Sequence, residues 1–144
     1  MTIVTLTKKQ FNPLASVGDI VWCYIPHAEC EGEPGPYPRP GLVVKRSVED
    51  HAVMVVFGTS QKTDRVYDTE FVIRKGEAGY TVSGLARDTK FDMSRMYKLP
   101  YDSDWFDLAP IQNGVATTSP VMGVLHPSYM PALKKAHAKA VKAA

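Results

Sequence analysis

Runs of apolar residues separated by short turns predict a chain built mainly of β-strands. The ranges 20–25, 41–46 and 52–57 are rich in the β-branched and aromatic side chains that favour strands. The run at 52–57 is the most continuous, so we expect a central strand that is buried on both faces. Further short strands are expected at 70–73 and 95–99. Short strands at this close spacing, with turn signals between them, predict a small β-barrel or sandwich.

The two ends of the chain differ in pattern. Residues 1–12 read as a tail or an extra edge strand, because their alternation is broken by lysines. The range 128–142 predicts a helix with a weak apolar stripe and lysines on the remaining positions. Ser128 is the expected N-cap of this helix, and Pro131 suits its first turn.

The range 101–126 has no clear periodicity, and we interpret it as an insertion between the last strand and the helix. At 144 residues the chain is long enough for one domain with a real core. We therefore expect a single domain over 1–144, with the barrel formed by about 17–100.

A stiff arm, residues 26–38, separates the first two predicted strands. Its prolines and glycines exclude a helix and discourage strand pairing. Arg39 follows the arm at the start of the second strand. A guanidinium held there suits phosphate recognition, because it is a planar fork of donors that stays charged. The alternative is a structural Arg39 that pairs with a carboxylate such as Glu31 or Glu33.

The composition is that of an ordinary soluble globular protein, with 44% hydrophobic and 22% charged residues. A net charge of +2 is too small to indicate nucleic-acid binding by itself, although it permits a local basic patch. The sequence shows neither a transmembrane run nor a signal-peptide pattern, so we expect a cytoplasmic protein with no membrane association. Cys23 and Cys30 are then expected to be reduced thiols.

The residues Cys23, His27 and Cys30 raise the question of a metal site. Their spacing matches no standard closed zinc site, and a fourth ligand is not apparent. We therefore expect no metal and no cofactor, with Cys23 as a small core residue and Cys30 in the arm.

Basic residues and tyrosines in the second half of the barrel leave two interpretations open. They form either a face on which RNA or DNA bases stack, or ordinary solvated strand edges on which lysine discourages aggregation. The residues concerned are Lys62, Arg65, Arg74, Lys75, Arg87, Lys90, Arg95 and Lys98, with Tyr67, Tyr80 and Tyr97.

Four sequence blocks follow one another in a fixed order. They are Gly18-Asp19-Ile20-Val21, Arg39-Pro40-Gly41-Leu42-Val43-Val44, Gly58-Thr59-Ser60 and the later Gly84-Leu85-x-x-Asp88-Thr89-x-Phe91-Asp92. In this order the blocks resemble the MazF/PemK toxin family. The resemblance covers about residues 17–100 and implies an SH3-like β-barrel with a C-terminal helix, usually assembled as a homodimer.

The resemblance also implies an activity. Active members are metal-independent endoribonucleases that cut single-stranded RNA, leaving a 2′,3′-cyclic phosphate and a 5′-hydroxyl, and an antitoxin protein neutralises them. Arg39 and Thr59 match the family's catalytic arginine and threonine. A fixed guanidinium and a hydroxyl would stabilise the extra charge on the phosphorane oxygens. Proton transfer then falls to His27 in the arm or to the Arg87 and Asp88 pair.

Further RNA contacts are expected beside these residues. The arm departs from the family pattern, because it is longer and its glutamates would repel RNA phosphates unless they are paired. The alternatives are a non-catalytic SH3-like binding module and a phage or plasmid accessory protein on the same fold. A catalytic function requires Arg39 and Thr59 to converge in one open groove. The expected RNA contacts are Pro38, Ser60, Gln61, Lys62, Arg65 and Lys90.

Overall fold

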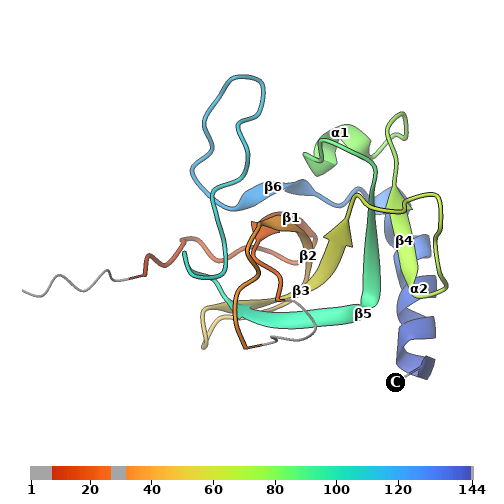
Figure 1. The fold of residues 1–144 in the computed structure, drawn as a ribbon, viewed down its shortest axis with the longest axis horizontal. Coiled ribbons are helices and arrows are strands. Elements are labelled where there is room, and N and C mark those ends of the chain that lie inside the picture. The colour runs from red at the N-terminus through yellow and green to blue at the C-terminus, as the bar shows by residue number, and fades with distance from the viewer. Residues whose placement is uncertain (1–7, 27–31, 144) are drawn as a thin grey trace, which may run out of the picture.

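A computed structural model describes residues 8–26 and 32–143 of the chain. Its six strands form one antiparallel sheet in the order β4-β5-β3-β2-β1-β6, and the sheet curls into a half-barrel (Figure 1). The predicted class, mainly β with a C-terminal helix, is confirmed. The elements are β1 (Asp19–Cys23), β2 (Arg39–Ser47), β3 (Ala52–Thr59), β4 (Glu70–Ile73), α1 (Tyr80–Ser83), β5 (Thr89–Pro100), β6 (Val121–Val124), the 3-10 turn η1 (Pro127–Tyr129) and α2 (Met130–Ala143).

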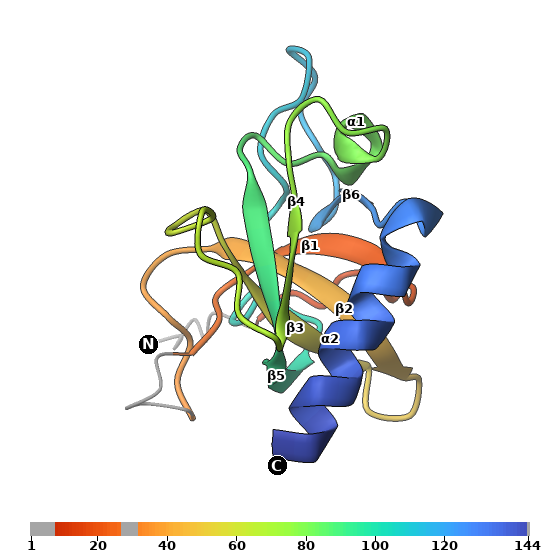
Figure 2. The same cartoon turned by 90° about the vertical axis from the view of Figure 1, so that its right-hand side faces the viewer.

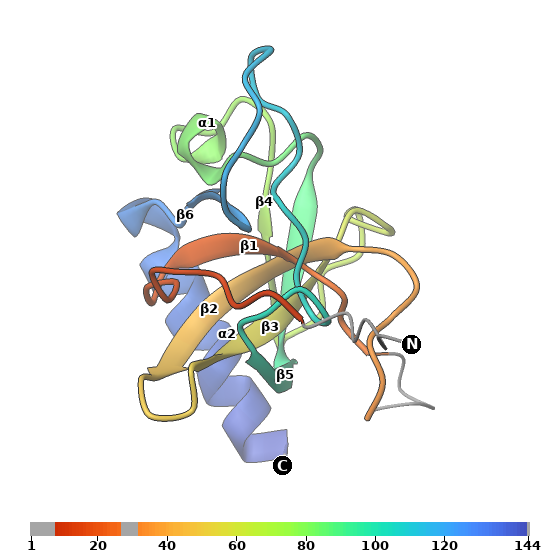
Figure 3. The ribbon, with the colours of Figure 1, turned by 90° about the vertical axis from the view of Figure 1, so that its left-hand side faces the viewer.

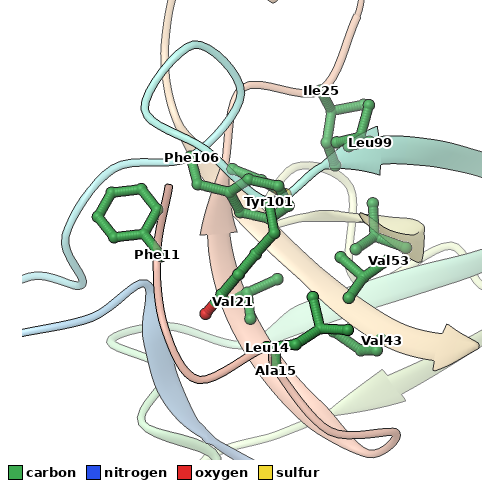
Figure 4. Packing of buried hydrophobic residues seen from close by; sticks show 12 residues of the cluster. Phe11, Leu14, Ala15, Val21, Ile25, Val43, Val53, Leu99, Tyr101 and Phe106 are labelled. Carbon is green, nitrogen blue, oxygen red and sulfur yellow. The ribbon is translucent and has the colours of Figure 1, made fainter. Parts of the chain in front are cut away.

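Strand alternation divides the buried residues into two clusters on opposite faces of the sheet. In β1, Val21 and Cys23 belong to one cluster and Ile20 to the other. Residues 11–15 and 101–106 cover the first face, where the N-terminal segment crosses β1 and β2 (Figures 3 and 4). Helix α2 and the edge strand β4 pack over the second face (Figure 2), and their side chains belong to its cluster. Burial on both sides explains the continuous apolar run of β3.

The structure differs from the sequence prediction at the N-terminal segment and at the last predicted strand. Residues 1–12 were expected to be a tail or an extra edge strand; residues 1–7 lie outside the described residues, and Gln10 forms only an isolated bridge with Asp102. The strand expected at 95–99 is part of the longer β5, which has 12 residues. Sequence reasoning missed this continuity because β5 contains an irregularity.

The irregularity in β5 is a shift of its register against β3. Val56 lies opposite Met96, whereas the next residue, Phe57, lies opposite Asp92. Residues 93–95 are therefore additional on the β5 side, as in a β-bulge. Bulges bend a strand and change the direction of its side chains.

The C-terminal helix begins differently from its prediction. His126 caps η1, because its ring Nδ1 accepts a hydrogen bond from the backbone N–H of Ser128 at 3.0 Å. The expectation that Ser128 is the N-cap is therefore wrong, since the 3-10 turn starts the helical segment earlier in the chain. Pro131 does lie in the first turn of α2. In the described part of the chain, neither helix has the length and apolar content needed to cross a bilayer.

Residues 101–126 are built into the core. Tyr101 and Phe106 are each 1% exposed, and their ring centroids are 4.9 Å apart in an edge-to-face arrangement (Figure 4). Phe106 also bridges to Cys23 of β1, and β6 then extends the sheet beyond β1. The segment between Phe106 and β6 projects beyond the sheet (Figure 1), where it lines the site described below.

Gly84 ends α1 in a conformation that other residues adopt poorly. Its φ angle is +70°, and a Cβ atom there would overlap the carbonyl group of Met122 in β6. We expect Gly84→Ala to lower the free energy of unfolding by about 1–3 kcal/mol, measured by urea denaturation. Gly114→Ala is the matched control, because Gly114 has a φ of +76° but no atom within 4 Å of the added Cβ. Equal losses for the two variants would contradict a role for the contact with β6.

Candidate functional site

An open groove of about 750 Å³ lies at one end of the half-barrel. Six stretches from distant parts of the chain form it: β1, the start of β2, the end of β3, the chain from α1 to β5, the projecting segment before β6, and β6 itself. The lining residues are Trp22, Pro38, Arg39, Pro40, Gly58, Thr59, Ser60, Tyr80, Thr81, Gly84, Leu85, Ala86, Arg87, Thr89, Pro110, Ile111, Gln112, Asn113 and Met122.

Arg39 is held by the sheet while its head group stays accessible. It is the first residue of β2 and lies opposite Cys23 of β1. The side chain is half-buried, with Cζ 6.0 Å from the ring centroid of Phe57. The four ion pairs formed within residues 8–26 and 32–143 do not include Arg39. Of the two glutamates suggested as its partners, Glu33 is exposed and Glu31 lies outside the described residues.

Thr59 lines the groove at the end of β3, next to a glycine that has no room for a side chain. The Oγ1 of Thr59 accepts a hydrogen bond from the backbone N–H of Gln61 at 3.1 Å. The hydroxyl hydrogen can therefore still be donated to a ligand. A Cβ on the preceding Gly58 would lie 2.7 Å from the Pro40 carbonyl oxygen, so glycine permits the close approach of β2 and β3. Arg39 and Thr59 thus line the same groove, as a catalytic site requires.

Arg87 and Asp88, which were expected to act as a pair, have different surroundings. Arg87 is exposed and lines the groove. Asp88 accepts a hydrogen bond from the backbone N–H of Lys75 at 2.8 Å and lies 3.7 Å from Nη1 of Arg74. The carboxylate of Asp88 therefore has Arg74 as its described ionic partner. His27, the other candidate for proton transfer, lies outside the described residues.

The predicted RNA contacts fall into three groups, of which the third consists of the buried Lys90. Pro38 and Ser60 line the groove. Gln61, Lys62 and Arg65 lie in the exposed loop after β3, beyond the groove lining.

Lys90 is the predicted contact whose position conflicts most with a surface role. It is only 6% exposed, and its Nζ donates to the backbone carbonyl of Arg65 at 2.8 Å and to Oε1 of Glu70 at 3.3 Å. Its charge is therefore balanced inside the protein. Sequence reasoning missed this burial because the partner, Glu70, comes from the neighbouring strand β4.

Several groove residues were not predicted as site residues. Trp22 and Tyr80 offer aromatic rings, and Gln112 and Asn113 offer amide groups. Burial, and then the charge of Asp88, raise the pKa of Tyr80, so its phenol stays protonated and can donate a hydrogen bond at neutral pH. The position of Trp22 could have been predicted, because strand alternation places it on the face opposite the buried Cys23. The projecting segment has no sequence pattern that predicts its contribution to the groove.

Cys23 is the small core cysteine that the sequence predicts. It is fully buried, and burial raises the pKa of its thiol. Its Sγ donates to the backbone carbonyl of Arg39 at 3.6 Å. Cys30, like His27, lies outside the described residues, so the Cys23, His27 and Cys30 constellation is not described as a unit.

The chemistry of the groove suits a single strand of nucleic acid. Two guanidinium groups, several hydroxyls and two aromatic rings face one open space, and the described lining contains no carboxylate. Cations and hydroxyls bind phosphate oxygens, and aromatic rings stack with bases.

Solved structures share this fold, and two of them are endoribonucleases. An endoribonuclease from a mycobacterial species aligns with a TM-score of 0.55 and 15% sequence identity, over 92% of this chain and 96% of that chain. An endoribonuclease in complex with its cognate antitoxin, also mycobacterial, aligns with a TM-score of 0.53 and 16% identity, over 87% of this chain and 92% of that chain. No family model and no curated protein matches the sequence. The shared fold of these endoribonucleases confirms the fold that the sequence resemblance implied.

Proposed function

We propose that this protein is a metal-independent endoribonuclease of the MazF/PemK toxin type that cleaves single-stranded RNA. The observation that carries the proposal is that Arg39 and Thr59, which match the family's catalytic pair, line one open groove. The endoribonucleases that share the fold support the same activity. The products would be a 2′,3′-cyclic phosphate and a 5′-hydroxyl.

The reaction assigns a role to each residue. The 2′-oxygen attacks the adjacent phosphorus, the 2′-oxygen–phosphorus bond forms, and the bond to the 5′-oxygen breaks. Arg39 stabilises the charge that develops on the phosphorane oxygens, and Thr59 donates a hydrogen bond to the same group. Removal of the 2′-proton and return of a proton to the leaving 5′-oxygen then fall to His27, because Asp88, the other candidate base, is paired with Arg74 and does not line the groove.

The proposal includes a protein partner. One of the endoribonucleases that share this fold was solved with its cognate antitoxin. An acidic segment of such a partner would compete with RNA for the guanidinium groups of Arg39 and Arg87. We propose that the protein acts in the cytoplasm as a homodimer, with an antitoxin that covers the groove.

The direct test is cleavage of several unrelated long single-stranded RNAs by purified protein, with EDTA or with Mg²⁺. We expect equal cleavage in both, with end-group analysis that identifies cyclic phosphates and 5′-hydroxyls. RNA that stays intact at high protein concentration and long incubation would overturn the proposed nuclease activity. Cleavage that EDTA abolishes would overturn metal independence.

Thr59 provides a graded test of the same site. Because Thr59→Val removes one hydrogen-bond donor at nearly constant shape, we expect the cleavage rate at saturating RNA to fall about 10–100-fold. Thr63→Val is the matched control, since Thr63 lies in the loop after β3 and outside the groove lining. A similar loss in both variants would argue against a specific role for Thr59.

One observation favours a second candidate, a non-catalytic module that binds RNA. The described groove lining contains neither histidine nor a carboxylate, the side chains that most often remove a proton. A protein that binds single-stranded RNA in this groove and never cleaves it would establish the second candidate.

A further inference from the structure

A second, smaller hollow shares Arg39 with the groove. Its volume is about 140 Å³, and Arg39 lines both spaces. Arg39 is therefore in a position to contact ligand groups in both spaces. The lining residues are Ile25, Pro26, Pro36, Tyr37, Arg39, Phe57 and Arg95.

Two cations converge on one aromatic ring in this hollow. The Cζ atom of Arg95 lies 4.1 Å from the ring centroid of Phe57, and that of Arg39 lies 6.0 Å from the same centroid. The ring attracts both guanidinium groups through its quadrupole, but the two positive charges repel each other. An anion placed between them would remove this repulsion and gain charge-assisted hydrogen bonds.

The bulge in β5 directs Arg95 toward the hollow. Residues 93–95 are the additional residues on this strand. Asp92 fixes the bulge, because its Oδ1 accepts hydrogen bonds from the backbone N–H of Ser94 at 2.9 Å and from Oγ1 of Thr69 at 3.0 Å. The carboxylate nearest to Arg95 in the sequence is thus already engaged.

Arg95 itself is oriented but has no described counter-charge. Its Nη2 donates to the hydroxyl oxygen of Tyr97 at 3.3 Å. None of the four ion pairs within the described ranges 8–26 and 32–143 involves Arg95. A half-buried arginine with an aromatic support and no ion pair there is well suited to bind a phosphate.

We propose that Arg95 and Arg39 hold the phosphate of the nucleotide next to the cleaved one. This second phosphate subsite rests on the proposed RNA-binding function and extends it. Arg39 then contacts both phosphates, whereas Arg95 contacts only the second and acts as a positioning residue. Tyr37, which is 70% exposed at the rim of the hollow, offers its ring to the base of that nucleotide.

The test measures RNA binding and cleavage separately for Arg95→Ala. Because one phosphate contact is lost, we expect Kd for a 2′-deoxy-substituted oligomer and KM for cleavage to rise about tenfold, while kcat changes less than twofold. The slope of log K against log salt should fall by about 0.7, the value expected for one phosphate of a single strand. Arg95→Lys should restore the slope, because it keeps the charge.

Lys98→Ala is the matched control for Arg95→Ala. It removes a cation from the same strand, but Lys98 is exposed and paired with Asp50 on another surface. Arg95→Gln serves if the alanine variant does not fold. An unchanged salt slope and KM in a wild-type-like nuclease would overturn the subsite and leave the proposed function intact. A wild-type protein that binds no single-stranded RNA would overturn both.

Discussion

Replacement of Arg39 by alanine is expected to lower the rate of RNA cleavage by about 10²–10³-fold at saturating RNA. This is the loss typical of removing one preorganised donor from a site that stabilises a developing negative charge. Arg39 is preorganised because its backbone pairs with Cys23 of β1 and its side chain lies beside the ring of Phe57. Single-turnover cleavage of a defined oligomer measures the change in the chemical step.

The matched control is Arg46→Ala. Arg46 also lies in β2, but it is exposed and does not line the groove. We expect its cleavage rate to stay within about twofold of the wild type, since exposed substitutions away from a site have small effects. Equal losses in the two variants would show that charge alone, rather than the position of Arg39, matters.

Replacement of Phe106 by alanine is expected to lower the free energy of unfolding by about 3–5 kcal/mol. Phe106 is 1% exposed and packs edge-to-face against Tyr101, and Phe11 also packs edge-to-face against that tyrosine (Figure 4). The small residue would leave a cavity between the sheet and the N-terminal segment. Urea denaturation, monitored by tryptophan fluorescence, measures the loss.

Val115→Ala is the control for Phe106→Ala. Val115 lies in the same range, 101–126, but it is 67% exposed. Its replacement should change the free energy of unfolding by no more than about 0.5 kcal/mol. A loss below about 1 kcal/mol for Phe106→Ala would contradict the conclusion that this range belongs to the core.

Local sequence patterns predict most of the sheet. The strand at 70–73 is found with its expected limits, and the run at 52–57 lies within the central strand β3. Both have β-branched and aromatic side chains, and turn residues bound them, so their structure depends little on distant residues. The continuity of β5 was not predictable, because the bulge opposite Val56 and Phe57 breaks the two-residue period.

The sequence predicted those site residues that lie at the end of a single strand. Arg39 and Thr59 stand at the ends of apolar runs, and the resemblance matches both. Gln112 and Asn113 were missed because they reach the groove only through contacts between distant segments. Lys90 was expected at the surface, but its burial depends on the pairing of β4 with β5, which a single strand does not reveal.

The capping of the last helical segment shows a similar limit. Ser128 has the residue type of an N-cap, whereas His126 does the capping in the structure. Residue preferences predict that a cap exists more reliably than they predict which residue forms it.

The most direct test of the central claim is a map of where single-stranded RNA binds. Backbone amide chemical shifts are recorded while the protein is titrated with an oligomer that carries 2′-deoxy sugars and is therefore not cleaved. We predict the largest shifts at residues 58–60, 84–87 and 111–113, which line the groove. Shifts confined to α2, or none at saturating oligomer, would contradict the assignment of this groove to RNA.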